Sequence, residues 1–229
     1  MCGRYAATAN PAELVETYDI TLVTDDGEAA AAPSWNVAPT DPVAAVLERV
    51  DGDNVVRKLV GLKWGLVPSW SKDPSGGSRM INARVETIVE KPAFRNAVAA
   101  RRCIVPALGY YEWRPEPEGA KQIKQPYLLR PEGGRLVAMA GIYEFWKGPD
   151  GWLSTVAIIT TSATDELGWV HDRMPMTPLD LDAWLDPSLT SGEAARQLLA
   201  APADLLPVKV SRRVNSVANN DPGLIEPLA

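Results

Sequence analysis

The sequence predicts an α+β domain built on a mostly antiparallel β-sheet or barrel, with helices at its periphery. Segments with strand patterns outnumber segments with helix patterns, and the two kinds do not alternate regularly along the chain. The 20 Pro and 17 Gly are spread over the 229 residues instead of being pooled in a linker. We therefore expect one domain that covers residues 1–229.

The first part of the chain contains the clearest helix start and the clearest hairpin. Asn10 is followed by a proline, so Asn10 is predicted to be the N-cap and the proline to occupy the first helical position. Two strand patterns, residues 42–50 and 55–64, flank an Asp-Gly-Asp turn. The Ala-rich stretch from Glu28 to Ala32 is expected to be a loop.

The remaining sequence is predicted to be richer in strands than in helices. The strand patterns lie at residues 102–107, 126–130, 135–143 and 152–161, and the helix patterns at 91–101, 178–185 and 193–200. Thr190 or Ser191 would cap the last helix. In the segment MINARVET, alternation places Asn82, Arg84 and Glu86 on one face of a further short strand.

The composition is that of a globular domain and excludes several other classes. Apolar residues make up 46% and charged residues 23%, which is typical of a packed domain and not of a disordered chain. We expect no membrane span and no secretory signal, because no apolar stretch is long enough. Two Cys and one His cannot form a disulfide framework or a four-ligand Cys/His zinc site, so we expect a reducing, cytoplasmic compartment and no metal or cofactor. The net charge of −6 disfavours a bulk polyanion binder but leaves room for a local basic cleft.

Cys2 is a candidate nucleophile because removal of Met1 would make it the first residue. Methionine aminopeptidases generally remove Met before a small residue. The freed residue would carry an amine and a thiol on adjacent carbons, with reference pKa values of about 7.7–8.0 and about 8.5. Such a pair condenses with aldehydes to a thiazolidine, and it can also act in acyl transfer. Taken alone, Cys2 is better explained as an incidental residue at a frayed terminus.

His171 and Glu112 are the candidates for proton transfer. His171 is the only histidine, so it is the only imidazole available for acid–base work near pH 7, although it could equally be a hydrogen-bonded loop residue. Glu112 lies in GYYEW, where a strand would turn it away from Tyr111 and Trp113. Desolvation among aromatic rings would raise its pKa, but the sequence alone favours a solvated face.

Some polar and aromatic residues have the chemistry of a nucleic-acid site. The amide of Asn82 and the guanidinium of Arg84 could fix a phosphate or a sugar, or could lie on a wet strand face. The chain has 8 Trp against 2 Phe, and most indoles should be in the core, while others could stack on unpaired bases. Basic residues cluster at Arg79, Arg84, Arg95, Arg101 and Arg102, and again at Lys209, Arg212 and Arg213. Charge clusters of this kind are usually solvated.

The combination and order of six motifs is far more specific than any one residue. They are MCGRY at 1–5, WNVAPT at 35–40, WGLVPSW at 64–70, NARVET at 82–87, RRCIVPALGYYEW at 101–113 and HDRMP at 171–175. In this order the chain strongly resembles the SOS response-associated peptidase (SRAP) family, whose members are abasic-site processing proteins that attach covalently to DNA. The resemblance extends to VSRRVN at 210–215 and so covers nearly the whole chain.

The resemblance implies four catalytic residues. Cys2, freed of Met1, would capture C1′ of the ring-opened abasic deoxyribose as a thiazolidine. Glu112 would act as general acid and base for ring opening, imine formation and reversal. His171 would be the proton shuttle at the sugar oxygen, and Asn82 would orient the Cys2 amine and the sugar. Holding both nucleophiles on one residue makes ring closure intramolecular.

The resemblance also implies how DNA is bound. The expected contacts are Arg4, Arg84 and Arg173 at phosphates, Trp70, Trp113 and Pro39 at stacked or wedged bases, and Thr160 and Thr161 in a DNA-contacting segment. The implied partner is single-stranded DNA that contains an abasic site, with the replication machinery as a further candidate. The protein would be a monomer associated with the nucleoid or replication fork during the DNA damage response.

The sequence alone leaves two other functions possible. Cys2 could be the nucleophile of an N-terminal-nucleophile thiol amidase or peptidase, with His171 or the terminal amine as base, and self-removal of an N-terminal segment would be such an activity. The chain could also be a non-covalent reader of single strands or modified bases, with Cys2 incidental. A purely structural domain is disfavoured by the ordered motifs.

Overall fold

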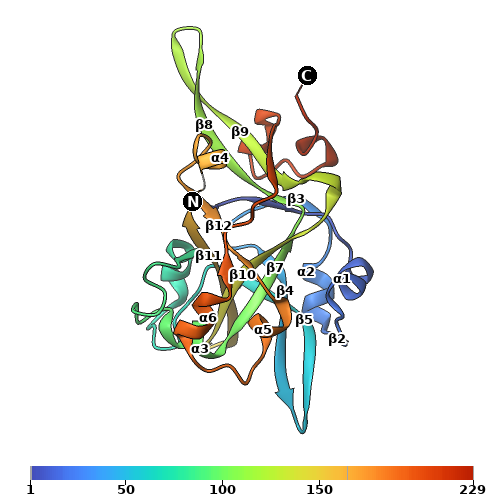
Figure 1. The fold of residues 1–229 in the computed structure, drawn as a ribbon, viewed down its shortest axis with the longest axis vertical. Helices are drawn as coiled ribbons and strands as arrows, with labels where there is room; N and C mark the ends of the chain where they lie inside the picture. The colour runs from blue at the N-terminus through green and yellow to red at the C-terminus, as the bar shows by residue number, and fades with distance from the viewer. Residues whose placement is uncertain (1, 164, 229) are drawn as a thin grey trace.

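A closed barrel of five strands forms the centre of the fold in the described part of the chain (Figure 1). The computed structural model describes residues 2–163 and 165–228. The barrel strands are β4 (Pro42–Asp51), β5 (Asn54–Trp64), β7 (Arg102–Ala107), β10 (Val137–Gly148) and β11 (Gly151–Ser162). Around the ring the strands follow the order β5-β4-β7-β10-β11, in which neighbours pair antiparallel, and the parallel pairing of β11 with β5, at Thr155↔Lys63 and Val156↔Trp64, closes the ring. The predicted fold class is confirmed.

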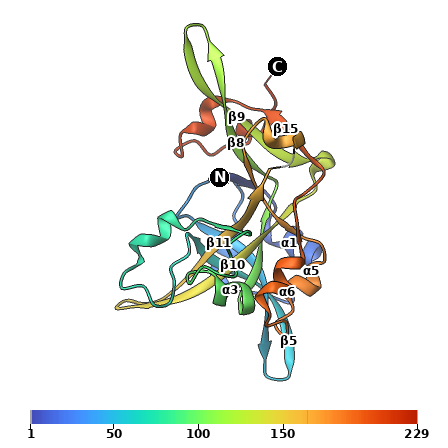
Figure 2. The same cartoon turned by 60° about the vertical axis from the view of Figure 1, so that its left-hand side comes forward.

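A second antiparallel sheet stands on the barrel and carries a long projecting hairpin. Its strands follow the order β15-β9-β8-β1-β3. They are β1 (Tyr5–Ala7), β3 (Ser34–Val37), β8 (Gly109–Glu118), β9 (Lys121–Pro131) and β15 (Leu205–Lys209). The hairpin of β8 and β9 extends beyond the rest of this sheet (Figures 1 and 2). Because β8 begins two residues after β7 ends, the barrel and the second sheet are directly continuous.

Short strands extend the barrel sheet, and helices cover its outside. The short strands are β2 (Leu22–Val23) on β5, β6 (Asn82–Arg84) and β12 (Arg173–Pro175) on β11, and β13 (Thr177–Pro178) paired with β14 (Leu199–Ala200). The α-helices are α1 (Pro11–Tyr18), α2 (Asp25–Ala30), α3 (Arg95–Ala100), α4 (Asp165–Gly168), α5 (Leu181–Leu185) and α6 (Gly192–Gln197). Short 3₁₀-helices lie at Pro74–Arg79, Glu132–Gly134, Arg212–Asn215 and Pro222–Leu224. Within the described ranges, none of these helices has the length and apolarity needed to cross a membrane.

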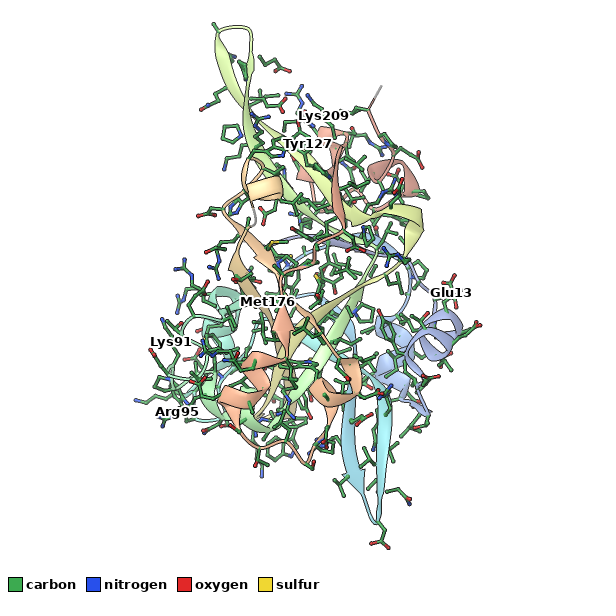
Figure 3. The ribbon with its side chains drawn as sticks, viewed as in Figure 1. Glu13, Lys91, Arg95, Tyr127, Met176 and Lys209 are labelled. Atoms are coloured by element: carbon green, nitrogen blue, oxygen red, sulfur yellow. The ribbon has the colours of Figure 1, made fainter. Side chains whose placement is uncertain are left out.

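The apolar core follows the two faces of the barrel strands. Along β7, Cys103 and Val105 join a cluster that also holds Cys2, whereas Ile104 joins a cluster shared with the helices. Met176, labelled in Figure 3, belongs to the helix-side cluster. Trp184 of α5 is fully buried there, and its indole Nε1 donates to the Cys103 carbonyl at 2.8 Å. The helices therefore pack on one face of β7 while the other face reaches the N-terminal segment.

Two predicted elements are confirmed in detail. Asn10 Oδ1 accepts from the Glu13 backbone N at 3.1 Å, and Glu13 Oε2 accepts from the Asn10 backbone N at 2.7 Å, so both ends of the capping box are formed. The predicted hairpin is the pair β4–β5, whose register runs from Pro42↔Lys63 to Asp51↔Asn54. Local sequence is sufficient for both elements, because their caps and turns are made by neighbouring residues.

Three other predictions need correction. The Ala-rich stretch predicted as a loop is mostly helix α2. The Thr24 side chain caps this helix by accepting a hydrogen bond from Gly27 N. The helix also packs so closely on β5 that a Cβ at Gly27 would lie 2.3 Å from the Leu59 carbonyl oxygen. The helix predicted at 91–101 spans only Arg95–Ala100. The helix predicted at 193–200 ends at Gln197, since residues 199–200 pair with β13 instead; its cap is Ser191.

Candidate active site

Cys2 is anchored by the strand that follows it. Tyr5 of β1 pairs with Tyr110 of β8, and the Tyr111 backbone N donates to the Arg4 carbonyl at 2.8 Å. This ladder draws the N-terminal segment onto the barrel, where Cys2 is fully buried in the apolar cluster that also contains Trp64. Cys2 is therefore packed in the core and does not lie at a frayed terminus as its own neighbourhood suggested, while Met1 lies outside the described residues.

The Cys2 thiol is held in its neutral form. Burial raises its pKa well above the usual range, the charge of Glu112 raises it further, and a hydrogen bond from the Arg4 backbone opposes the shift. Burial likewise raises the pKa of Cys103, and both cysteines are free thiols. Neither is a preformed thiolate, so a reaction at the Cys2 sulfur must include removal of its proton.

Asn82 links the N-terminal segment to the barrel. It is the first residue of β6, which runs parallel to β11 with Asn82 opposite Ile158. Its Nδ2 donates to the Cys2 carbonyl oxygen at 2.8 Å. Its Oδ1 is buried and has no hydrogen-bond partner among residues 2–163 and 165–228. Because a buried unsatisfied acceptor costs about 1–3 kcal/mol, this oxygen is placed to receive a donor beside Cys2.

Glu112 is buried, contrary to the solvated face that its sequence favours. It lies on β8 with 3% of its surface exposed, directly opposite Tyr127 of β9. Burial is the main cause that raises the pKa of Glu112 to about 7. A carboxyl group with this pKa can both donate and accept a proton near neutral pH.

His171 faces Glu112 from the loop between α4 and β12. Its Nε2 lies 3.8 Å from Glu112 Oε2, and burial lowers its pKa below the usual value. Its Nδ1 lies 2.9 Å from Asp172 Oδ1 and accepts from the Arg173 backbone N at 3.1 Å. A single nitrogen cannot serve both partners in one protonation state. The lowered pKa favours the neutral ring with Nδ1 as acceptor and the proton on Nε2, toward Glu112.

Arg173 and Thr160 belong to the scaffold beneath His171. The Arg173 guanidinium forms a bidentate pair with Glu86, at 2.6 and 3.0 Å, and its Nη2 also donates to the Thr160 carbonyl at 2.8 Å. Arg173 and Thr160 are buried, and Thr161 is half-buried. The charge of Arg173 is thus already engaged, and the side chain ties the loop after β6 to β11 and β12.

Arg4 and Trp113 lie together on the opposite face of β8 from Glu112. Arg4 Nη1 donates to Asn36 Oδ1 at 2.8 Å and to the Val214 carbonyl at 3.0 Å, and its guanidinium lies 5.8 Å from the Trp113 ring centroid. The indole Nε1 of Trp113 donates to Asn215 Oδ1 at 2.7 Å. Burial lowers the pKa of Arg4.

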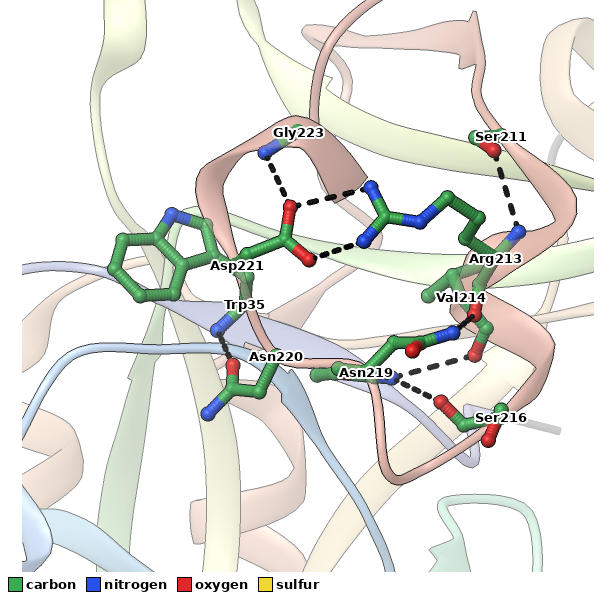
Figure 4. Close-up of polar contacts among 10 residues, drawn as sticks. Trp35, Ser211, Arg213, Val214, Ser216, Asn219, Asn220, Asp221 and Gly223 are labelled. Atoms are coloured by element: carbon green, nitrogen blue, oxygen red, sulfur yellow. Dashed lines mark hydrogen bonds and ion pairs between the residues drawn. The ribbon is translucent and has the colours of Figure 1, made fainter.

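The C-terminal segment that supports Arg4 is itself braced by ion pairing. Arg213 pairs with Asp221, whose Oδ1 also accepts from the Gly223 backbone N at 3.1 Å (Figure 4). Asn220 Oδ1 accepts from the Trp35 backbone N at 2.7 Å, which fastens this segment to β3 (Figure 4). Residues of the VSRRVN stretch therefore support Arg4 and Trp113 on the face of β8 opposite Glu112.

Three further predicted DNA contacts are accessible. Trp70 has 67% of its surface exposed, Arg84 is exposed and Pro39 is half-buried. The structure thus brings Cys2, Asn82, Glu112 and His171 together and leaves these three side chains at the surface.

Sequence reasoning missed the partners that hold the site residues in place. Glu86 pairs with Arg173, and Asp172 contacts His171. Strand alternation had placed Glu86 on the face of Asn82 and Arg84, and that pattern could have drawn attention to it. Asp172 adjoins the only histidine, which is the simplest signal for a positioning carboxylate.

The arrangement as a whole suits nucleophilic addition to a carbonyl group. A neutral thiol, a carboxyl group that titrates near pH 7, an imidazole and a free amide oxygen surround one position. No group of three or more His, Cys, Asp or Glu in the described ranges could hold a metal ion. The chemistry available from these residues is acid–base and nucleophilic catalysis.

Comparison with known proteins places these motifs in a family context. The sequence model of the family described as "SOS response associated peptidase (SRAP)" matches residues 1–217. The chain is 39% identical to "Abasic site processing protein YoqW" of Bacillus subtilis, over 99% of both chains. It is 33% identical to "Abasic site processing protein HMCES" of Gallus gallus, over 86% of this chain and 66% of the relative. A crystal structure of a protein from Bacteroides thetaiotaomicron, 26% identical, superposes with a TM-score of 0.82 over 100% of both chains.

Proposed function

Because this chain belongs to the SOS response-associated peptidase family, we propose that it processes abasic sites in DNA and does so by covalent capture through Cys2. Relatives along its whole length carry the name abasic site processing protein. The observation that carries the proposal is the convergence of Cys2, Asn82, Glu112 and His171 from four separate segments of the chain. This set of groups suits addition to an aldehyde that is masked as a cyclic hemiacetal.

The first step is addition of the Cys2 amine, released by removal of Met1, to C1′ of the abasic sugar. The sugar ring opens when the hydroxyl proton at C1′ leaves and the ring oxygen takes up a proton, which exposes an aldehyde. The amine nitrogen attacks C1′, and loss of one water leaves an imine. The unpartnered Oδ1 of Asn82 supports this step, because it can accept a hydrogen bond from the Cys2 amine and so direct the lone pair of the amine nitrogen toward C1′.

The second step closes the ring through sulfur. The Cys2 Sγ forms a bond to C1′, the C=N π electrons move to nitrogen, and the thiol proton is transferred to that nitrogen. The product is a five-membered thiazolidine, which lacks the exchangeable imine. Because the thiol is neutral and buried, a base must take its proton during attack, and Glu112 lies close enough to influence its ionisation.

Glu112 and His171 divide the proton transfers. Glu112, with a pKa of about 7, can protonate the leaving hydroxyl and accept the thiol proton in turn. His171, neutral with its Nε2 proton toward Glu112, serves the sugar oxygen during ring opening. The same groups, acting in the reverse order, would allow the crosslink to be undone.

The binding residues suit an unpaired strand of any sequence. The exposed ring of Trp70 and the half-buried ring of Trp113 offer faces for bases, and the exposed Arg84 offers charge for a phosphate. Local positive charge is sufficient in a chain of net charge −6, because only the DNA path needs to be basic. We infer that the protein acts on single-stranded DNA as a monomer, at the nucleoid or replication fork and near the replication machinery.

The decisive experiment mixes the matured protein with single-stranded DNA that carries one abasic site and then denatures the sample. We expect a heat-stable gel shift that is lost in Cys2→Ala and retained in Cys103→Ala, which removes the other buried thiol. Mass spectrometry should show that Met1 is absent and that the adduct has lost one water. A retained Met1 in the protein isolated from cells would contradict the proposal.

Incubation of the same matured protein with peptides, beside the incubation with DNA, tests the thiol amidase or peptidase hypothesis. The family name and a Cys2 thiol beside Glu112 and His171 favour this as the second candidate function. Cleavage of peptides without any adduct on DNA would support it, and binding to single strands without an adduct would support a non-covalent reader.

A further inference from the structure

We propose that Trp169 and Arg114 form a second stacking platform, which binds the base of a nucleotide next to the abasic one. The proposal rests on the proposed function and identifies a subsite for its single-stranded DNA. Neither residue belongs to the motifs that indicated the catalytic site. The platform lies on the face of β8 that carries Glu112, opposite the face that carries Trp113.

Strand register places Arg114 two positions further along β8 than Glu112, toward the turn of the β8–β9 hairpin. Glu112 and Arg114 are two residues apart on β8, so both side chains leave the same face of the hairpin. Their partners on β9 are Tyr127 and Gln125, and Tyr127 also pairs with Lys209 of β15. Figure 3 shows Tyr127 and Lys209 close together near the base of the hairpin.

Trp169 lies over this face from the loop that holds His171. Its ring centroid lies 4.7 Å from the Arg114 guanidinium carbon and 5.3 Å from the Tyr127 ring, which meets it edge to face at 83°. Figure 1 shows α4, which precedes Trp169, beside the β8–β9 hairpin. Although packed on two sides, Trp169 keeps 43% of its surface exposed. A large open aromatic surface therefore lies two residues before His171.

The charges around Trp169 suit a phosphate backbone. Beyond Arg114 on this face of the hairpin lie two acidic residues, and both are paired. Glu116 pairs with Lys209 at 2.8 Å and accepts a hydrogen bond from the Tyr127 hydroxyl, and Glu118 pairs with Arg212 at 3.0 Å. Arg114 forms no ion pair within residues 2–163 and 165–228, and its guanidinium lies over the Trp169 ring and near Tyr127 and Glu116. An aromatic ring beside an arginine is a combination that binds unpaired nucleotides without sequence preference.

The two faces of β8 thus carry matching arginine–tryptophan pairs. Arg4 lies 5.8 Å from the Trp113 ring on one face, and Arg114 lies 4.7 Å from the Trp169 ring on the other. Glu112 precedes both Trp113 and Arg114 on β8, and it shares its face of the strand with Arg114 and not with Trp113. A strand whose abasic sugar is at Glu112 would therefore meet the Arg114–Trp169 pair on the same face of the sheet.

The test measures the affinity of the full-length protein for oligonucleotides with tetrahydrofuran in place of the abasic sugar. This analogue has no C1′ hydroxyl and forms no adduct, so binding is separated from crosslinking. We expect Trp169→Ala to weaken binding by about fivefold or more, as loss of one stacked base implies. The difference should vanish when the neighbouring nucleotide on one side, either 5′ or 3′, is also tetrahydrofuran. Trp169→Phe should retain most of the affinity.

Trp152 provides a matched control. It is an exposed tryptophan with Lys147 5.7 Å from its ring, but it lies on the β10–β11 hairpin, which ends far from the β8–β9 hairpin (Figure 2). Trp152→Ala should leave the affinity unchanged. An equal loss in Trp169→Ala with every oligonucleotide would mean that Trp169 only holds the His171 loop, and no loss would mean that no base stacks there. Either result overturns the platform. Adduct formation on a true abasic oligonucleotide, measured separately, reports on the proposed function itself.

Discussion

Glu112 Oε2 and His171 Nε2 lie 3.8 Å apart, although β8 carries one residue and the loop before β12 carries the other. Burial shifts their pKa values toward each other, upward for Glu112 and downward for His171. Both groups can therefore be uncharged near neutral pH. This pair, beside a neutral Cys2 thiol, is suited to passing protons without leaving a lasting charge on either group.

Glu112→Gln should slow crosslink formation far more than it weakens DNA binding. Glutamine retains the shape but cannot exchange a proton, so we expect a rate loss of about 100-fold or more, with affinity for intact single strands changed less than twofold. The rate of the wild-type protein should change with pH near 7, and this dependence should disappear in the variant. Parallel losses of rate and affinity would contradict the acid–base role.

The same variant should change how stability depends on pH. Burial raises the pKa of Glu112 from 4.5 to about 7, so the folded state binds more protons than the unfolded state between these values, and stability falls as pH rises through this window. Glutamine has no proton to lose. Glu112→Gln should therefore be more stable than the wild type at pH 8, by about 1–3 kcal/mol, with little difference at pH 4. Urea unfolding at the two pH values checks this, and an advantage at pH 4 alone would refute it.

Arg84→Ala should weaken binding to single strands and lower its salt dependence. Arg84 is exposed at the end of β6, two residues after Asn82, so loss of one phosphate contact should reduce the slope of log affinity against log salt by about 0.7. Arg95, an exposed arginine of α3 labelled in Figure 3, provides the matched control. An unchanged slope in Arg84→Ala would remove this residue from the phosphate contacts.

Glu86→Ala should destabilise the fold and slow crosslinking together. It removes the bidentate partner of Arg173, whose backbone N–H donates to His171. Since Glu86 is partly exposed, we expect a loss of about 1–2 kcal/mol in urea unfolding. Glu86→Gln, which keeps one acceptor, should lose less. A denaturation midpoint that does not move would show that the pair is not needed.

Gly65→Ala should be among the most damaging substitutions outside the candidate active site. Gly65 follows β5 with φ of 131°, and a Cβ there would lie 2.7 Å from the Gly77 carbonyl oxygen. We expect a loss of several kcal/mol in unfolding free energy. Gly76→Ala, where the nearest atom to the new Cβ is the flexible end of Met80 at 3.6 Å, should change stability little. Similar melting temperatures for the two variants would refute the close-approach argument.

Much of the fold could be predicted because the deciding interactions are local. The Asn10 capping box and the β4–β5 hairpin are specified by residues a few positions apart. Helix α2 was not predicted because the interaction that favours it, its packing against β5, joins residues far apart in the sequence. An internal glycine weakens the helix pattern, but that glycine is what allows α2 to lie against β5. Residues 199–200 were assigned to a helix for the same reason, since their pairing with β13 is tertiary.

The site was predictable by motif and not by physical pattern. Cys2 and Glu112 were each expected at the surface from their own neighbourhoods, and both are buried. Their burial depends on β1 pairing with β8, which brings the first residues against a strand more than a hundred positions later. No periodicity near Cys2 encodes that contact. Only the ordered set of motifs indicated that the residues would meet.

Strand β11 carries β6 on one edge and β12 on the other, so Asn82 and His171 are both suspended from a single strand of the barrel. Any rigid movement of this strand displaces the two segments by a similar amount, and the gap between them is conserved while the whole unit shifts. Fluctuations of the barrel, or neutral substitutions around its circumference, therefore leave the separation of Asn82 and His171 unchanged, provided that β11 itself is not disturbed.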